Sequence, residues 1–325
     1  MLEAFRALQR DGLGVLDVGS RGGVHPVLAA IAPLLDVVGL EPDQTECQRL
    51  AATATNGHRF KSLRYLPYAL GETDREGTLH LCRAAGSSSL YKPNRSLLDR
   101  FPDEHRYDVV GTVNVPIRSI DSLRQEAQLP RWLDFFKIDT QGSELQVLRG
   151  AAQTLRHQVV AIEVEVEFAA LYEGQPLFRD VDAFLASFGF MLFKLRRQEW
   201  VRRALAARSY LSAGQVVFGE ALYLRDPLGL PQGDMFQEAH HLEALILLAT
   251  RFDLHDFALE LLSTPQVANR LEAPESIRQW IERRSRKLAS LTERLRTARA
   301  WYGANGSRRY AARWGRGDHN FYSVL

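Results

Sequence analysis

Short apolar segments alternate with amphipathic helical segments along the chain, and this alternation restricts the fold more than any other feature of the sequence. Strands that alternate with helices predict right-handed crossovers and therefore an α/β fold, with helices on both faces of a mostly parallel sheet. Segments 77–82 and 112–117 alternate apolar and polar residues instead, which predicts an added hairpin or edge pair. The predicted core strands occupy residues 15–19, 37–41, 133–139, 159–167, 190–195 and 221–226, and the segment 62–70 contains a further one.

The predicted helices carry recognisable end signals. Asp43 can cap the helix that follows it, with Glu46 as the partner in a capping box. Gly189 suits the residue just past a helix end. The other helices predicted in this part of the chain occupy residues 24–35, 144–155 and 180–188.

Three of the predicted strands end in a glycine or an acid, namely Gly19, Glu41 and Asp139. Ligands of such sheets bind beyond the carboxyl ends of the strands, so these residues predict a ligand site there. The turn after the first strand reads LDVGSRGG (16–23), which places glycines where a backbone must approach a ligand closely. Its spacing fails the glycine pattern of dinucleotide-binding proteins, which disfavours a dehydrogenase.

An acid before the glycine turn and another at the end of the next strand suit S-adenosylmethionine. This cofactor carries an ammonium, a sulfonium and a ribose, and Glu41 stands where a carboxylate can accept hydrogen bonds from two ribose hydroxyls. The alternative is an ordinary tight turn, with Glu41 as a solvated loop acid.

The chain resembles the FkbM-type S-adenosylmethionine-dependent methyltransferases over roughly residues 10–226. The most specific match is the pattern Lys137, Asp139, Gly142 and Glu144; the chain departs from the family by Ser20-Arg21 in place of Ala-Asn. The resemblance implies a class I methyltransferase fold, Rossmann-like with a seven-stranded sheet, and O-methylation of sugars or polyketides. The matching segments are LDVGSRGG (16–23), GLEPD (39–43), ALGE (69–72), SSL (88–90), VPIRSIDSL (115–123), FFKIDTQGSELQVLRG (135–150) and IEVEVEFAALYEGQPLF (162–178).

The site residues are predicted on these segments. Methyl transfer to a hydroxyl needs alignment of the acceptor and removal of its proton, and the expected catalytic residues are Asp139, Glu163 and Glu144. Glu144 could instead be a surface acid that complements a helix dipole. The expected cofactor-binding residues are Asp17, Gly19, Ser20, Arg21, Gly23, Glu41, Pro42, Ala69 and Asp139.

A hydroxylated acceptor, a small molecule or a glycan, is expected beside the cofactor. Glu163, Glu165 and Glu167 alternate, so they share one face of a strand and either line the cleft or emerge into solvent. Acids near Asp139 could hold Mg²⁺, but no compact Asp-Asn pair follows, and we predict no metal. The expected acceptor-binding residues are Ser88, Tyr91, Asn94, Gln141, Glu165, Tyr172 and Gln175.

The chain changes character after Pro227, where strand signals stop and helical periods continue. We predict a methyltransferase domain over 1–226 and a helical, basic extension over 227–325. From Ala268 onward there are 13 Lys and Arg against 5 Asp and Glu. This basic segment is either a helix that packs on the domain with its charged face in solvent, or a contact surface for an anionic glycan, an acidic lipid surface or an oligomer partner. No recognition motif supports nucleic-acid binding.

Composition adds weaker constraints. Two cysteines without metal or redox spacing, and a first segment without a signal-peptide core, favour the cytoplasm. The adjacent His240 and His241 are expected to be surface or packing residues. The competing functional hypothesis is a non-catalytic scaffold or binding module that keeps the fold.

Overall fold

A seven-stranded sheet with the order β3-β2-β1-β7-β8-β10-β9 forms the centre of the protein. The computed structural model describes residues 2–54, 60–206, 212–229 and 235–286. All pairs are parallel except those of β10, which runs antiparallel to both β8 and β9. This is the class I methyltransferase topology. The strands are β1 (Leu13–Val18), β2 (Leu35–Leu40), β3 (Ser62–Leu66), β7 (Phe135–Ile138), β8 (Ala161–Glu167), β9 (Phe190–Trp200) and β10 (Gln215–Arg225).

Alternating side chains give the sheet two covered faces. Leu16, Phe136 and Ile162 lie on one face, in a core completed by the helices α4 to α7. Val15 and Phe135 lie on the other, in a core shared with α1, η2 and the C-terminal helices. The covering elements are α1 (Arg6–Asp11), η2 (Pro26–Leu34), α4 (Ile120–Gln125), α5 (Glu144–Arg149), α6 (Ala152–His157) and α7 (Phe178–Ser187).

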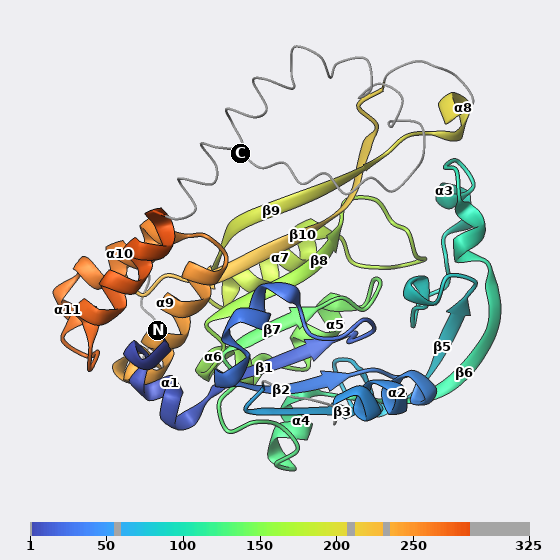
Figure 1. Cartoon of the computed structure of the whole chain (residues 1–325). Helices are drawn as coiled ribbons and strands as arrows, with labels where there is room; N and C mark the ends of the chain where they lie inside the picture. The colour runs from blue at the N-terminus through green and yellow to red at the C-terminus, as the bar shows by residue number, and fades with distance from the viewer. Residues whose placement is uncertain (1, 55–59, 207–211, 230–234, 287–325) are drawn as a thin grey trace.

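The predicted hairpin is confirmed as an antiparallel pair, but it belongs to a separate sheet. β5 (Arg75–Cys82) pairs with β6 (Val109–Arg118), and β4 (Ala69–Leu70) lies on the other side of β6. The strand predicted within 62–70 is confirmed as β3, and the end of the same segment forms β4, which lies in the other sheet. Figure 1 shows β5 and β6 near α3 (Arg95–Leu98), at the opposite end of the molecule from the C-terminal helices.

Three helix predictions need correction. The helix predicted over 144–155 is two short helices, α5 and α6, separated at Gly150. Helix α2 (Gln44–Ala54) is capped by Asp43, whose Oδ1 accepts from the backbone N–H groups of Thr45 and Glu46. The capping box is wrong, however, because the Glu46 carboxylate accepts from the Arg49 guanidinium instead. The segment 24–35 is helical but of the tighter 3₁₀ type, and it ends where β2 begins.

The segment after residue 227 is helical as predicted, and it packs into the same core as the sheet. Phe5, near the N-terminus, stacks edge-on against Trp280 at 5.2 Å between ring centroids. Figure 1 shows these helices beside α1, so both ends of the described chain meet there. The division at 226 stays a prediction. The helices are α9 (Ala239–Arg251), α10 (His255–Ser263), α11 (Pro265–Ala268) and a helical segment over 274–286.

Only part of the predicted basic helix lies in the described chain. Arg284 lies 3.5 Å from Asp253, and Arg286 lies 3.4 Å from Glu282. Lys287, Arg294, Arg296 and Arg299 lie outside the described residues. Among the helices that are described, none has the length and apolar character needed to cross a membrane.

Candidate active site

The glycine turn that follows β1 is tied to the ends of two neighbouring strands. The backbone N–H groups of Gly19 and Ser20 both donate to the Leu40 carbonyl at the end of β2, at 3.1 Å. The Ser20 hydroxyl donates to the Asp17 carbonyl at 2.6 Å. Gly19 has a φ of +78°, and a Cβ there would lie 1.9 Å from the Asp139 carbonyl oxygen. A glycine is thus required where β1 and β7 end side by side.

Replacing Gly19 by alanine is expected to destabilise the protein by about 2 kcal/mol more than replacing Gly23. Both residues have positive φ, so both changes strain the backbone, but a Cβ on Gly23 meets nothing within 4 Å. Urea unfolding of Gly19→Ala and Gly23→Ala measures the difference. Equal losses in the free energy of unfolding would contradict the close approach to Asp139.

Glu41 lies buried beyond the end of β2, with 4% of its surface exposed. Its Oε1 accepts from the Asp43 N–H at 3.0 Å and lies 3.6 Å from the Arg21 guanidinium. Burial raises the pKa of Glu41, against the opposing effect of these two partners. The solvated loop acid considered as an alternative is therefore wrong.

A pocket opens between these strand ends and the small sheet. Its lining includes Glu41 and Pro42 after β2, Asp139 and Gln141 after β7, and the apolar side chains of Leu79 and Leu81 from β5. Six residues predicted to bind the cofactor line this pocket: Gly19, Arg21, Glu41, Pro42, Ala69 and Asp139.

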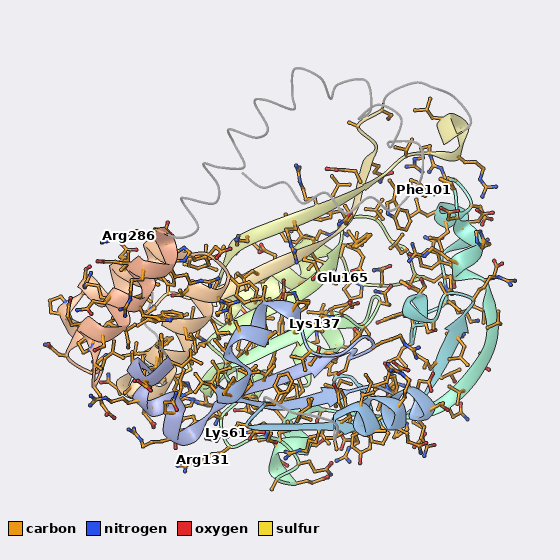
Figure 2. The ribbon with its side chains drawn as sticks, viewed as in Figure 1. Lys61, Phe101, Arg131, Lys137, Glu165 and Arg286 are labelled. Atoms are coloured by element: carbon orange, nitrogen blue, oxygen red, sulfur yellow. The ribbon has the colours of Figure 1, made fainter. Side chains whose placement is uncertain are left out.

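The turn after β7 connects this pocket to the acidic face of β8. Lys137 Nζ donates to Asp139 Oδ2 at 3.0 Å. Gln141 Nε2 donates to both Asp139 Oδ1 and Glu165 Oε1, each at 2.8 Å. Figure 2 shows Lys137 and Glu165 in the middle of the molecule, between the end that carries Arg286 and the end that carries Phe101. Gln141 thereby holds the two carboxylates at fixed positions.

Glu144 is neither a surface acid nor directed freely at the cleft. It is 2% exposed, and its carboxylate accepts from the N–H groups of Thr140 and Gly142 and from the Thr140 hydroxyl. Both Gln141 and Gly142 have positive φ in this turn. Glu144 therefore braces the backbone that presents Asp139 and Gln141.

Glu163, Glu165 and Glu167 share one face of β8, and all three are buried, so the alternative that they emerge into solvent is wrong. Glu163 lies 3.4 Å from both His25 and Arg196. Burial, reinforced by neighbouring carboxylates that include Asp139 and Glu144, raises the pKa values of Glu165 and Glu167 well above the usual range. The carboxyl groups of Glu165 and Glu167 therefore hold protons more tightly than ordinary carboxyl groups.

Asp17 is 3% exposed and belongs to the same charged face. Burial raises the pKa of Asp17 to about 7, against the opposing effect of Lys137. Burial also raises the pKa of Glu220 to about 7. A group whose pKa is raised in the folded state binds more protons there than in the unfolded chain, so its contribution to stability is lost as pH rises through about 7.

As pH rises from 5 to 8, the free energy of unfolding of Asp17→Asn is therefore expected to increase relative to that of the wild type. The change should be on the order of 2–4 kcal/mol, because each pKa unit corresponds to about 1.4 kcal/mol. Urea unfolding at several pH values measures it, with the exposed Asp11→Asn as a control. A difference independent of pH would contradict the raised pKa of Asp17.

A second pocket lies on the far side of Gln141, and the sequence did not predict most of its lining. It shares Gly86 and Gln141 with the first pocket and includes Glu165. Its other side chains come from the β9–β10 hairpin and from the segment before β6, which are distant in sequence. They are Arg106, Tyr107, Gln198, Trp200 and Phe218, together with Leu171.

The predicted acceptor residues are divided between these pockets and the structure that supports them. Gln141 and Glu165 line the second pocket, whereas Ser88 lines the first. Tyr172 is fully buried and donates to the Ser87 carbonyl, with its hydroxyl 3.1 Å from Gln141 Oε1. Gln175 accepts from the Tyr172 backbone N–H. These last two residues therefore support Gln141.

Two further predicted acceptor residues do not line either pocket. The Asn94 amide donates to the Ala170 carbonyl at 2.8 Å. Tyr91 is partly buried, which raises the pKa of its hydroxyl.

Oxygen atoms of Asp139, Glu165 and Glu220 lie within 4.8 Å of one another, so three carboxylates could approach a hard cation. The Lys137 ammonium already compensates Asp139 from 3.0 Å. The absence of a catalytic metal stays a prediction.

The sequence from residue 17 to residue 192 matches the model of the Methyltransferase FkbM domain, which is more than half of the chain. The chain belongs to the FkbM methyltransferase family. The family depends on S-adenosylmethionine, as the sequence predicted. The match ends within β9, so the Trp200 and Phe218 side of the second pocket lies beyond it.

Solved structures resemble the chain only distantly. The FkbM methyltransferase from Methylobacillus flagellatus KT has 16% identity and a TM-score of 0.39, with 66% of this chain and 44% of that chain covered. The magnesium protoporphyrin IX methyltransferase from Synechocystis PCC 6803, which has S-adenosylmethionine bound, has 11% identity and a TM-score of 0.33, with 69% and 77% covered. This chain thus spans less than half of the Methylobacillus protein. No curated protein matches the sequence.

Proposed function

We propose that this FkbM-family protein binds S-adenosylmethionine in the first pocket and methylates a hydroxyl group of a glycan or glycosylated metabolite in the second. The observation that carries the proposal is the contact of the two pockets at Gln141, which joins Asp139 of the first to Glu165 of the second. In-line methyl transfer requires such adjacent sites for donor and acceptor.

The first pocket offers the groups that the cofactor needs. Glu41 suits the ribose hydroxyls, and Asp139 suits the cationic end of the ligand. Asp17 does not line this pocket, but it lies on β1 two residues before Gly19, which does, and its buried Oδ2 has no hydrogen-bond partner. When bound, S-adenosylmethionine supplies the electrophilic methyl group, and the protein aligns the acceptor.

Glu165 is our choice for the group that accepts the hydroxyl proton. It lines the second pocket, and because burial raises its pKa, its carboxylate form has a higher proton affinity than an ordinary carboxylate. Glu163 is less suited, because it lies against His25 and Arg196 and lines neither pocket. Glu144 serves by holding the turn that carries Gln141.

The lining of the second pocket favours a sugar-like acceptor. Trp200, Tyr107 and Phe218 form an aromatic surface, and Gln198 and Glu165 add polar groups. Aromatic faces bind the apolar faces of sugar rings, while a few placed polar groups fix their orientation. We place the protein in the cytoplasm, a proposal supported by two buried cysteines without a disulfide.

The first test is calorimetric titration of the folded protein with S-adenosylmethionine and S-adenosylhomocysteine. We expect micromolar binding that Asp17→Ala abolishes, followed by methylation of a hydroxyl in a panel of mono- and oligosaccharides. Folded protein that binds neither ligand would favour the non-catalytic scaffold and reject the enzyme.

Glu165→Gln is expected to lower kcat at least about 100-fold with little change in cofactor affinity, because general-base catalysis contributes about 10²–10⁴-fold. Glutamine keeps an oxygen that can accept from Gln141 but cannot take the proton. Glu167→Gln is the matched control, since Glu167 is buried on the same strand face and does not line the second pocket. Equal losses in both variants would mean that Glu165 is not the base.

A further inference from the structure

A second cluster of ionisable groups lies at the amino ends of the strands, away from both pockets. Asp134 immediately precedes β7 and is fully buried. His240 and His241 are the second and third residues of α9, and each is 3% exposed. Of the two expected roles, surface or packing, the surface role is wrong and the packing role is confirmed. Their ring nitrogens converge on the Asp134 carboxylate.

Hydrogen bonding accounts for only one of the two histidines. His240 Nε2 lies 3.0 Å and 3.1 Å from the two carboxylate oxygens of Asp134, which is hydrogen-bond distance. His241 Nδ1 lies 3.5 Å from Asp134 Oδ1 and has no hydrogen-bond partner. One ligand atom from each of the three residues lies within 4.8 Å of the others. A buried polar atom aimed at this cluster without a partner requires an explanation.

Neighbouring groups contact all three side chains. The Gly14 N–H donates to Asp134 Oδ2 at 2.9 Å, which orients the carboxylate. The Trp132 ring stacks on His240 at 4.0 Å between centroids and meets His241 edge-on at 5.1 Å. A ligating carboxylate that is itself hydrogen-bonded, as Asp134 is, is typical of metal sites.

The chemistry of the three side chains suits a metal ion. An imidazole ring can bind a metal through one of its nitrogens, and a carboxylate can bind one through an oxygen. Two such nitrogens and one carboxylate oxygen are a ligand set that Zn²⁺ accepts.

We propose that Asp134, His240 and His241 bind a divalent transition metal of the Zn²⁺ class. The ion would join α9 to the sheet. Asp134 precedes β7 and also accepts a hydrogen bond from Gly14 of β1, so the site lies where these two strands begin. Its role is to hold the C-terminal helices in place, and it is independent of the proposed methyl transfer.

Titration of the EDTA-treated full chain with CoCl₂ tests the site, because tetrahedral Co²⁺ absorbs visible light strongly. We expect one equivalent to bind in the micromolar range or tighter, an equivalent of ZnCl₂ to displace it, and Zn²⁺ to raise the Tm by several degrees. His241→Ala should abolish the absorption, whereas His105→Ala, at an exposed position, should keep it. No binding by the wild type, or equal binding by His241→Ala, would overturn the proposal.

Crystals of the wild-type protein grown with ZnCl₂ give a second test that does not depend on the folding of a variant. An anomalous difference peak surrounded by Asp134, His240 and His241 is expected. The absence of a peak there would overturn the proposal, and the cluster would then be a buried hydrogen-bonded contact between α9 and the sheet.

Discussion

Replacing Glu41 by alanine is expected to weaken S-adenosylmethionine binding about 100-fold and to leave the protein folded. The proposed contact is a buried carboxylate that accepts from two ribose hydroxyls, and each hydrogen bond to a charged group contributes about 1.5–3 kcal/mol. A loss of about 2.8 kcal/mol corresponds to 100-fold. Because burial raises the pKa of Glu41, its ionised form carries a cost in the free protein, so its removal should not lower stability.

Calorimetric titration of Glu41→Ala with the cofactor and its demethylated product measures this effect. Glu46→Ala is the matched control, since Glu46 lies on the next helix and its carboxylate pairs with Arg49. Unchanged affinity in Glu41→Ala would mean that the ribose lies elsewhere. An equal loss in Glu46→Ala would indicate an effect on the helix and not on a contact.

The position of the first pocket could be predicted from the sequence because its signals are local. A glycine turn and a terminal acid directly follow an apolar strand, and parallel strands bring their carboxyl ends to one edge of the sheet. Gly19, Glu41 and Asp139 therefore meet at one pocket, although they are far apart in sequence.

The lining of the second pocket could not be predicted from local sequence signals. Trp200 and Phe218 lie on a hairpin, and Tyr107 precedes β6, so only the three-dimensional packing brings them together. An alternating pattern identifies a strand but not the sheet to which it belongs. For this reason the sequence did not show that β4, β5 and β6 form a sheet of their own.

The prediction of one helix over 144–155 was wrong because a close tertiary contact overrides the local helical preference. A Cβ on Gly150 would lie 2.0 Å from the Gly71 carbonyl oxygen, so the chain approaches another segment between α5 and α6. The contact of His240 and His241 with Asp134 was not predicted, for a related reason. Their partner Asp134 is more than 100 residues away, and nothing in the local pattern indicates it.

Lys137→Met is expected to lower the free energy of unfolding by about 3–5 kcal/mol, the largest stability effect of any change proposed for this site. Burial alone would lower the pKa of Lys137, but the Asp139 carboxylate at 3.0 Å and the nearby Asp17 raise it above the usual value. The ammonium therefore stays charged and compensates buried acids. Removing it leaves the carboxyl groups of Asp17, Asp139 and Glu220 without the ammonium that compensates their negative charge.

The sign of the pH dependence follows from these acids. Without Lys137, the pKa values of Asp17 and Glu220 should rise above their present values of about 7. At pH 5 they are then protonated and the repulsion is small, whereas at pH 8 ionisation is costly in the folded state. Urea unfolding of Lys137→Met should show a larger loss at pH 8 than at pH 5.

Lys61→Met is the control, because Lys61 is exposed and donates to the Arg10 carbonyl at the surface; Figure 2 labels both lysines. A loss below about 1 kcal/mol in Lys137→Met, or a larger loss at pH 5, would show that the acids do not depend on this ammonium. The expected result has a consequence for the cofactor. If Lys137 neutralises only part of the negative charge on this face, the remaining charge is available to a cationic ligand, and the variant should gain part of its lost stability when S-adenosylmethionine is added.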